Sequence, residues 1–125
     1  MIKGIGVDAV YVSRMEKWRK TPGLLERYFH SEELSAALEK GGSADLSLAA
    51  RFAAKEAFGK ALGTGLGGIV LKDIMLKNKY NGQPEILVSG TALSALENSG
   101  AGKIHVSLTH EKDYAIAMVV LENEL

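Results

Sequence analysis

Asp8 is the first residue of the chain that could do chemistry, and it ends the run Gly4-Ile5-Gly6-Val7-Asp8. If this run is a β-strand, its side chains alternate, so Asp8 shares one face with the two glycines. Glycines on one strand face indicate that a ligand or another backbone comes close. Asp8 is therefore a candidate for binding a ligand or a cation, although capping a turn or pairing with a lysine is the commoner role of a single aspartate.

A second set of candidate groups lies in the segment RFAAKEAFGKAL, which begins at Arg51. On an α-helix, Glu56 and Lys60 would lie one turn apart, which is also the spacing of an ordinary surface ion pair. Arg51 and Lys55 would form a second, basic edge. The opposite side collects small and apolar residues that would let the helix pack closely against a neighbour and hold polar groups rigidly in a cleft: Ala53, Ala57, Phe58, Ala61 and Leu62.

A glycine-rich segment, Gly63-Thr64-Gly65-Leu66-Gly67-Gly68, follows directly. Such loops can bind phosphate through backbone amides, but the C-terminal end of a helix disfavours an anion. The segment also lacks the lysine of a G-x-x-x-x-G-K-[ST] loop, which excludes a nucleotide triphosphatase of that type. Ending the helix and contacting a ligand both remain open for Gly63.

Residues 103–109 alternate between apolar and polar side chains. As a strand, this segment would turn Ile104, Val106 and Leu108 toward the core. The opposite face would carry a polar stripe of His105, Ser107 and Thr109. A stripe of this kind suits a binding surface or a solvated sheet face equally well.

These candidate groups must be positioned by strands and helices, whose predicted order along the chain indicates an α+β fold. In this fold a mostly antiparallel sheet packs with one long helix and several short ones. Asn81-Gly82 is typical of a hairpin turn, and Ser13 with Glu16 predicts a capping box at a helix start. The predicted strands are residues 2–12, 69–77, 84–88, 103–109 and 114–122. Two predicted helices span residues 45–62 and 91–98, and two shorter ones begin at Ser13 and Ser31.

Composition narrows the classes of function. The chain has 125 residues, which predicts a single domain over 1–125. It contains no cysteine, so disulfides, thiolate metal sites and cysteine nucleophiles are excluded. Its 15 basic and 15 acidic residues balance, so no overall charge favours nucleic acid or a membrane surface. We expect a soluble, cytoplasmic protein, since no apolar run approaches the length of a spanning helix.

Three segments together resemble the holo-[acyl-carrier-protein] synthases, a family of 4′-phosphopantetheinyl transferases. They are GIGVD from Gly4, RFAAKEAFGKALGTG from Arg51 and HVSLTH from His105, and the middle one is highly specific. The resemblance implies the 4′-phosphopantetheinyl transferase fold. It also implies an enzyme that moves 4′-phosphopantetheine from coenzyme A to a serine of acyl carrier protein, in support of fatty acid biosynthesis. The carrier would change from apo to holo, and adenosine 3′,5′-bisphosphate would leave.

The same resemblance assigns roles to residues. Asp8 and Glu56 would hold Mg²⁺, an ion that favours few carboxylates completed by phosphate and water. Glu56, directly or through a water on the metal, would accept the serine proton, and Lys60 would stabilise charge on the phosphates. Many relatives carry an acid three positions after the aspartate, where this chain has Tyr11, so we expect water in its place. The residues that would contact coenzyme A are Arg51, Lys60, Gly63, His105, Ser107 and Thr109.

The strand predicted at 114–121, YAIAMVVL, has no polar alternation and requires burial on both faces. A partner subunit could cover the second face. The resemblance implies a homotrimer with shared sites, in which Asp8, Glu56 and Lys60 come from one chain and His105 from the next. It also places Arg14 at the start of the helix that meets the carrier protein.

Two other functions fit parts of the pattern. A non-catalytic sensor of coenzyme A or a nucleotide would not need Asp8, Glu56 and Lys60 together. A magnesium-dependent pyrophosphate hydrolase would need further acids to hold several metal ions, and residues 51–62 offer Glu56 alone. The transferase is therefore the interpretation that the residues favour.

Overall fold

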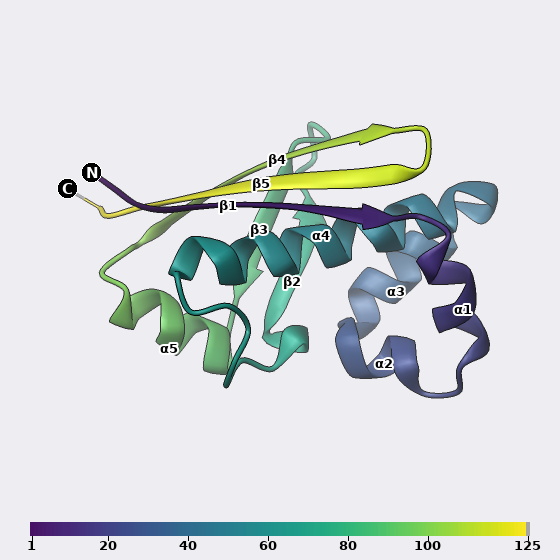
Figure 1. Ribbon diagram of the computed structural model, residues 1–125, viewed down its shortest axis with the longest axis horizontal. Helices are drawn as coiled ribbons and strands as arrows, with labels where there is room; N and C mark the ends of the chain where they lie inside the picture. Colours follow the sequence, from purple (N-terminus) through teal and green to yellow (C-terminus); the bar gives the residue numbers. More distant parts are fainter. Residues whose placement is uncertain (125) are drawn as a thin grey trace.

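The computed structural model describes residues 1–124 and has the α+β architecture that the sequence predicts. Three strands form an antiparallel sheet in the order β1-β5-β4: β1 (Ile2–Tyr11), β5 (Tyr114–Glu122) and β4 (Lys103–Glu111). The helix α4 (Ala44–Leu62) runs along one face of this sheet (Figure 1). A second sheet consists of the hairpin β2 (Ile74–Asn78) and β3 (Pro84–Val88).

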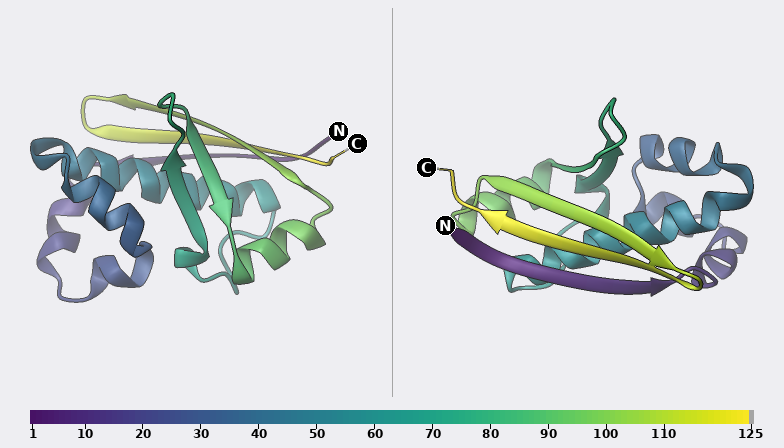
Figure 2. Two further views of the ribbon diagram at one scale, coloured as in Figure 1. Left: turned by 180° about the vertical axis from the view of Figure 1, so that it is seen from behind. Right: turned by 90° about the horizontal axis from the view of Figure 1, so that it is seen from above.

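Short helices surround the two ends of α4. At one end lie α1 (Arg14–Lys20), α2 (Leu24–Tyr28) and α3 (Ser31–Leu38), and α5 (Gly90–Asn98) lies at the other (Figures 1 and 2). Two 3₁₀ turns, Gly41–Ser43 and Leu71–Asp73, precede α4 and β2. Within residues 1–124, no helix combines the length and the apolar character needed to cross a membrane.

Most predicted elements begin and end within about two residues of the observed bounds. The predicted capping box at Ser13 is wrong. The backbone of Ser13 has helical φ and ψ of −61° and −22°, and its side chain makes no cap hydrogen bond. A capping hydroxyl needs an extended backbone to face the first amides of the helix. The box lies instead at the start of α3, where His30 is extended and pairs with Glu33.

The strand predicted from residue 69 begins only at Ile74. Residues before it are held by partners outside the sheet. Asp73 accepts hydrogen bonds from the amide and the hydroxyl of Thr91 at 2.8 and 2.6 Å, and the Lys55 ammonium donates to the carbonyls of Leu71 and Ile74. These long-range contacts favour a 3₁₀ turn over the β-conformation that the β-branched sequence predicts.

Gly4 and Gly6 let β1 pack closely against α4. A Cβ atom on Gly4 would lie 1.8 Å from the carbonyl oxygen of Ala61, and one on Gly6 would lie 2.0 Å from that of Ala57. Both distances are far inside van der Waals contact, so the helix backbone fills the space of two missing side chains. The predicted close approach on the glycine face is therefore confirmed, and the approaching group is α4.

This packing makes Gly6 intolerant of a side chain. Replacing Gly6 by alanine should lower the free energy of unfolding by about 3 kcal/mol or more, at or beyond the upper range for overpacking, because the new methyl group would overlap a backbone carbonyl rather than the end of a flexible side chain. Thermal unfolding followed by circular dichroism measures the effect. Gly42→Ala is the matched control, since its Cβ would meet nothing within 4 Å, and it should stay within about 0.5 kcal/mol of wild type. Equal stability of both variants would contradict the packing.

Candidate active site

Close contact between β1 and α4 brings Asp8 beside Lys60. Asp8 continues the glycine face of β1 and is half-buried against the helix. The Lys60 ammonium lies 3.0 Å from Asp8 Oδ1 and donates a second hydrogen bond, also of 3.0 Å, to the carbonyl of Val7. Two groups that are 52 residues apart in the sequence thus form one site.

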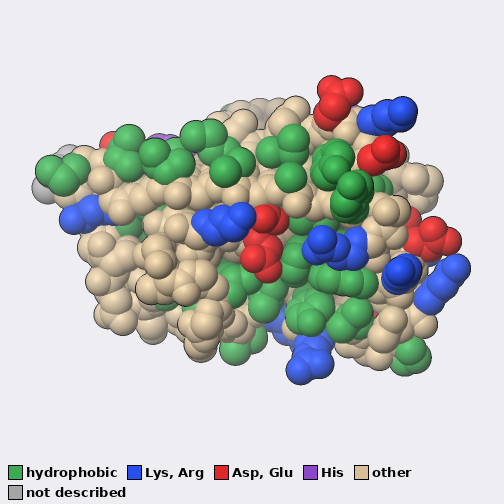
Figure 3. Space-filling model, viewed as in Figure 1, with side chains coloured by type: hydrophobic (Ala, Val, Ile, Leu, Met, Phe, Trp, Pro, Cys, Tyr) green, Lys and Arg blue, Asp and Glu red, His purple; other side chains and the backbone are tan. Residues whose placement is uncertain are grey.

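Glu56 and Lys60 both reach solvent beside Asp8. From residue 51 to 61 of α4, every residue is buried except Glu56, which is half-buried, and Lys60, which is exposed. A turn of helix separates them, so both side chains leave α4 in nearly the same direction. On the face drawn in Figure 3, acidic side chains lie between basic ones just below the sheet.

Glu56 has one acidic neighbour, Asp8, and two basic neighbours, Lys60 and Arg14. Burial raises the pKa of Glu56, and the charge of Asp8 raises it further, while Lys60 and Arg14 act in the opposite direction. Two partly desolvated carboxylates that repel each other are the arrangement that a bound cation relieves. Among residues 1–124, no three or more histidines or acids gather into a group able to hold a metal by themselves. The two carboxylates of Asp8 and Glu56 are donors of the kind that fit Mg²⁺, which takes few protein oxygens and completes its shell with phosphate and water.

Tyr11 does not substitute for a third acid. It lies three positions after Asp8 and so on the other face of β1. There its ring stacks on that of Tyr114, with the ring centroids 4.5 Å apart. Water remains the expected ligand at this position.

The polar stripe of β4 is present as predicted, with His105, Ser107 and Thr109 exposed and the alternate side chains half-buried. His105 Nε2 lies 2.9 Å from Glu122 Oε1, and this hydrogen bond lowers the pKa of Glu122. Strand register places the stripe on the outer face of the sheet, away from α4. A single chain therefore does not bring His105 together with Asp8, Glu56 and Lys60.

Arg51 is buried rather than part of an exposed basic edge. Its guanidinium donates to the carbonyl of Leu76 at 2.6 Å and to the hydroxyl of Ser47 at 3.3 Å, and burial lowers its pKa. The predicted basic edge of α4 is wrong in this respect, because Lys55 is buried as well. Arg51 also lines a cavity of about 300 Å³ together with Lys40, Thr109 and His110. Five residues of helix turn Arg51 about 140° away from Glu56, so the cavity opens on another flank of α4.

Gly63 ends α4 in the left-handed conformation with φ of 83°, as the sequence predicts. Its contact with a ligand stays a prediction. Beyond it, the glycine-rich segment borders a cavity of about 580 Å³ whose other wall is α5.

Sequence reasoning missed two features of the site. Lys40 and His110 face the cavity beside Arg51, and no motif connects them. Lys55 pairs with Glu33 inside the protein at 2.7 Å, although the two residues are 22 positions apart. The burial of Lys55 could not be predicted from its neighbours in sequence, because lysine is almost always exposed and its buried partner is distant in the chain.

Comparison with known families identifies the superfamily to which the chain belongs. The model of the 4′-phosphopantetheinyl transferase superfamily matches residues 4–119. The chain belongs to this superfamily. The match includes both strands and the helix that carry the candidate residues, from Asp8 to Thr109.

Individual relatives are similar along nearly the whole chain. The holo-[acyl-carrier-protein] synthase of Treponema denticola is 57% identical over 122 residues, which cover 98% of this chain and 99% of the relative. That of Treponema pallidum is 44% identical over 124 residues, covering 99% and 98%. Among solved structures, the holo-[acyl-carrier-protein] synthase of Neisseria meningitidis has a TM-score of 0.85 at 38% identity, covering 98% of this chain and 100% of that one. The enzyme from Bacillus anthracis, in complex with coenzyme A (3′,5′-ADP), has a TM-score of 0.82 at 35% identity and covers 99% of each chain.

The raised pKa of Glu56 has a measurable consequence for stability. A carboxyl whose pKa is higher in the folded state binds its proton more tightly there, so stability falls as pH rises from the unfolded pKa through the folded one. Glu56→Gln removes this penalty. In metal-free buffer at pH 7 its melting temperature should exceed that of wild type by about 1–4 °C. The difference should vanish near about pH 4, where the wild-type carboxyl is also protonated. A variant less stable at pH 7, or a difference that persists in acid, would contradict this electrostatic account.

Proposed function

We propose that this chain is a holo-[acyl-carrier-protein] synthase that transfers the 4′-phosphopantetheine group of coenzyme A to a serine of apo acyl carrier protein. The product is the holo carrier, and adenosine 3′,5′-bisphosphate leaves. The observation that carries the proposal is the group of Asp8, Glu56 and Lys60 at one opening beside α4. This group occurs in a chain that matches holo-[acyl-carrier-protein] synthases over nearly its full length.

Asp8 and Glu56 are the residues that would hold Mg²⁺. The ion, when bound, neutralises charge on the pyrophosphate during phosphoryl transfer. Glu56, directly or through a water on the ion, acts as the base that accepts the proton of the serine hydroxyl. The serine oxygen attacks the β-phosphorus, and the bond to the bridging oxygen of the departing nucleotide breaks. Lys60 is exposed and flexible enough to turn from Asp8 toward the phosphate oxygens, where its charge stabilises the transition state.

The cavity beside Arg51 is the proposed place for the nucleotide end of coenzyme A. Arg51, Lys40 and His110 supply basic groups for the 3′-phosphate, while Thr109 borders the cavity and contacts coenzyme A with the rest of the polar stripe. Leu46 and Leu108 give the same cavity an apolar wall suited to a base. His105, Ser107 and Gly63 complete the proposed contacts.

The separation of these two halves supports the proposed homotrimer with shared sites. The metal group lies at the β1 side of α4, while the nucleotide cavity lies on another flank and the polar stripe faces outward. The outer sheet face also carries uncovered apolar side chains, since Ile5, Val7 and Met118 are 57%, 56% and 45% exposed. Figure 3 shows hydrophobic side chains in a row along the sheet. A second copy of the chain would cover this face and add the polar stripe of one subunit to the metal group of the next.

The proposed setting is the cytoplasm, in fatty acid biosynthesis. The absence of cysteine suits a reducing compartment. Acyl carrier protein, the substrate in the relatives' name, is the partner that this assignment requires.

Mass spectrometry of a carrier protein tests the function directly. Apo carrier incubated with coenzyme A, Mg²⁺ and the chain should gain the mass of one phosphopantetheine on its serine. Asp8→Asn and Glu56→Gln should each lower the rate by at least about 100-fold while the circular dichroism spectrum is unchanged. Release of free phosphopantetheine with an unmodified carrier would indicate a hydrolase, and neither product would indicate a sensor.

Shared sites predict complementation between inactive chains. Glu56→Gln and His105→Ala chains, unfolded and refolded together, should recover activity up to about one quarter of wild type, because that fraction of interfaces receives two intact halves. Each variant refolded alone is the control and should stay inactive. An active monomer in sedimentation would contradict the trimer, and no recovery in a confirmed trimer would contradict the sharing of sites.

A further inference from the structure

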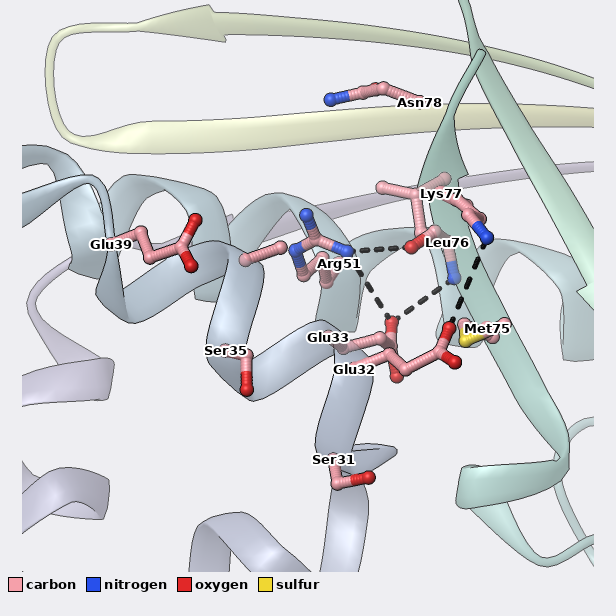
Figure 4. A pocket seen from close by; sticks show the side chains of 11 residues that line it. Ser31, Glu32, Glu33, Ser35, Glu39, Arg51, Met75, Leu76, Lys77 and Asn78 are labelled. Atoms are coloured by element: carbon pink, nitrogen blue, oxygen red, sulfur yellow. Dashed lines mark hydrogen bonds and ion pairs between the residues drawn. The ribbon is translucent and has the colours of Figure 1, made fainter. Parts of the chain in front are cut away.

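Glu33, Lys55 and Arg51 form a buried cluster of charges between α3, α4 and β2. The side chains of Glu33 and Lys55 are both fully buried, and that of Arg51 is 6% exposed. Glu33 and Arg51 also line a cleft of about 490 Å³, where Figure 4 shows both side chains converging on Leu76. Glu33 and Lys55 have no role in the transfer described above, whereas Arg51 also borders the proposed nucleotide cavity.

Every hydrogen-bonding group of Glu33 and Lys55 is used. The Lys55 ammonium donates to Glu33 Oε1 at 2.7 Å, to the carbonyl of Leu71 at 3.0 Å and to the carbonyl of Ile74, which accounts for its three protons. Glu33 also accepts from the amides of His30 and Leu76, both at 3.1 Å. The pair therefore connects α4 to α3 and to the start of β2 through fixed directional bonds.

A buried ion pair of this kind is rarely the most stable solution. Desolvating two charges costs about as much as their attraction returns, and apolar side chains of similar volume often do as well or better. Directional hydrogen bonds instead fix one particular arrangement of the elements that they join. The cluster is accordingly better explained by the geometry that it imposes than by stability.

The position of the cluster on α4 identifies what that geometry controls. At about 100° per residue, Ala57 and Ala61 lie about 100–140° to one side of Glu56, and Lys55 and Arg51 lie the same angles to the other side. The first pair meets the bare backbone of β1, and the second meets α3 and β2. Glu56 stands between these two walls, next in sequence to Lys55.

We propose that the Glu33–Lys55 pair is a positioning device that sets the rotation of α4 and thereby holds Glu56 opposite Asp8 for metal binding. The inference rests on the proposed function, because it needs the metal pair of that site. Contact with β1 limits how close α4 can come, but a smooth contact of glycine and alanine does not prevent the helix from turning. The directional bonds of Lys55 prevent it.

Manganese binding in the presence of coenzyme A, without carrier protein, tests the proposal independently of turnover. Electron paramagnetic resonance measures free Mn²⁺ over the full-length chain at a temperature where circular dichroism shows every variant folded. Lys55→Met should weaken Mn²⁺ binding by about 10–100-fold, the range for losing a residue that orients a metal ligand. Glu33→Gln keeps an oxygen for Lys55 but removes the buried charge, so it should weaken binding less.

Two matched controls separate positioning from loss of stability. Lys20→Met makes the same substitution in an exposed pair with Glu16 and should leave Mn²⁺ affinity unchanged. Leu96→Ala removes a buried side chain from α5 and destabilises the protein without touching the cluster's charges. It should keep Mn²⁺ affinity within about twofold of wild type.

The outcomes distinguish this inference from the function beneath it. Wild-type affinity in Lys55→Met overturns the positioning role, and so does an equal loss in Leu96→Ala at matched stability. If Lys55→Met does not fold, unchanged affinity in Glu33→Gln overturns it. A wild-type chain that binds no Mn²⁺ overturns the metal assignment itself.

Discussion

The carbonyl oxygens of Ala57 and Ala61 occupy the places where side chains on Gly6 and Gly4 would begin, and the site depends on this contact. Without Cβ atoms on that face, the strand and the helix approach until their backbones touch. Asp8 is the next residue on the same face, so its carboxylate is brought to the margin of α4 where Glu56 and Lys60 emerge. The constraint is steric and local, yet it joins two segments about fifty residues apart.

The remaining structure is arranged around that helix. The central part of α4, residues 51–61, is buried on all sides except the gap that contains Glu56 and Lys60. Such a helix could not stand alone, because its apolar surface is nearly continuous. The sheet, the β2–β3 hairpin and the short helices cover its apolar surface, while the buried charges of Glu33, Lys55 and Arg51 join α4 to α3 and β2 through directional hydrogen bonds. Asp8 and Glu56 are thereby held near enough for the charge of Asp8 to raise the pKa of Glu56, an unfavourable interaction of the kind that binding sites retain at a cost in stability.

Local sequence patterns predicted the fold well where local physics decides it. The alternation from Ile104 to Thr109, the glycine stop at Gly63 and the Asn81-Gly82 hairpin all depend on a few adjacent residues. The close approach to the glycine face of β1 was also predictable from the sequence, because a strand face without side chains allows another backbone to come near.

The wrong predictions concern residues whose conformation or burial depends on partners far away in the sequence. Ser13 has the residue type of a cap but a helical backbone, and residues 71–73 leave the expected strand because Lys55 and Thr91 bind them from elsewhere. The burial of Arg51 and Lys55 could not be read from a helical wheel, since Glu33 and the carbonyls that receive them come from distant elements. Long-range partners of charged residues are what single-sequence reasoning lacks.

A crystal structure with Mn²⁺ and coenzyme A would test the central claim most directly, because the anomalous signal of manganese locates the ion without interpretation of side chains. The account predicts one anomalous peak between the carboxylates of Asp8 and Glu56 of the same chain, adjoining the pyrophosphate. An ordered ion on the pyrophosphate that touches neither carboxylate would contradict it.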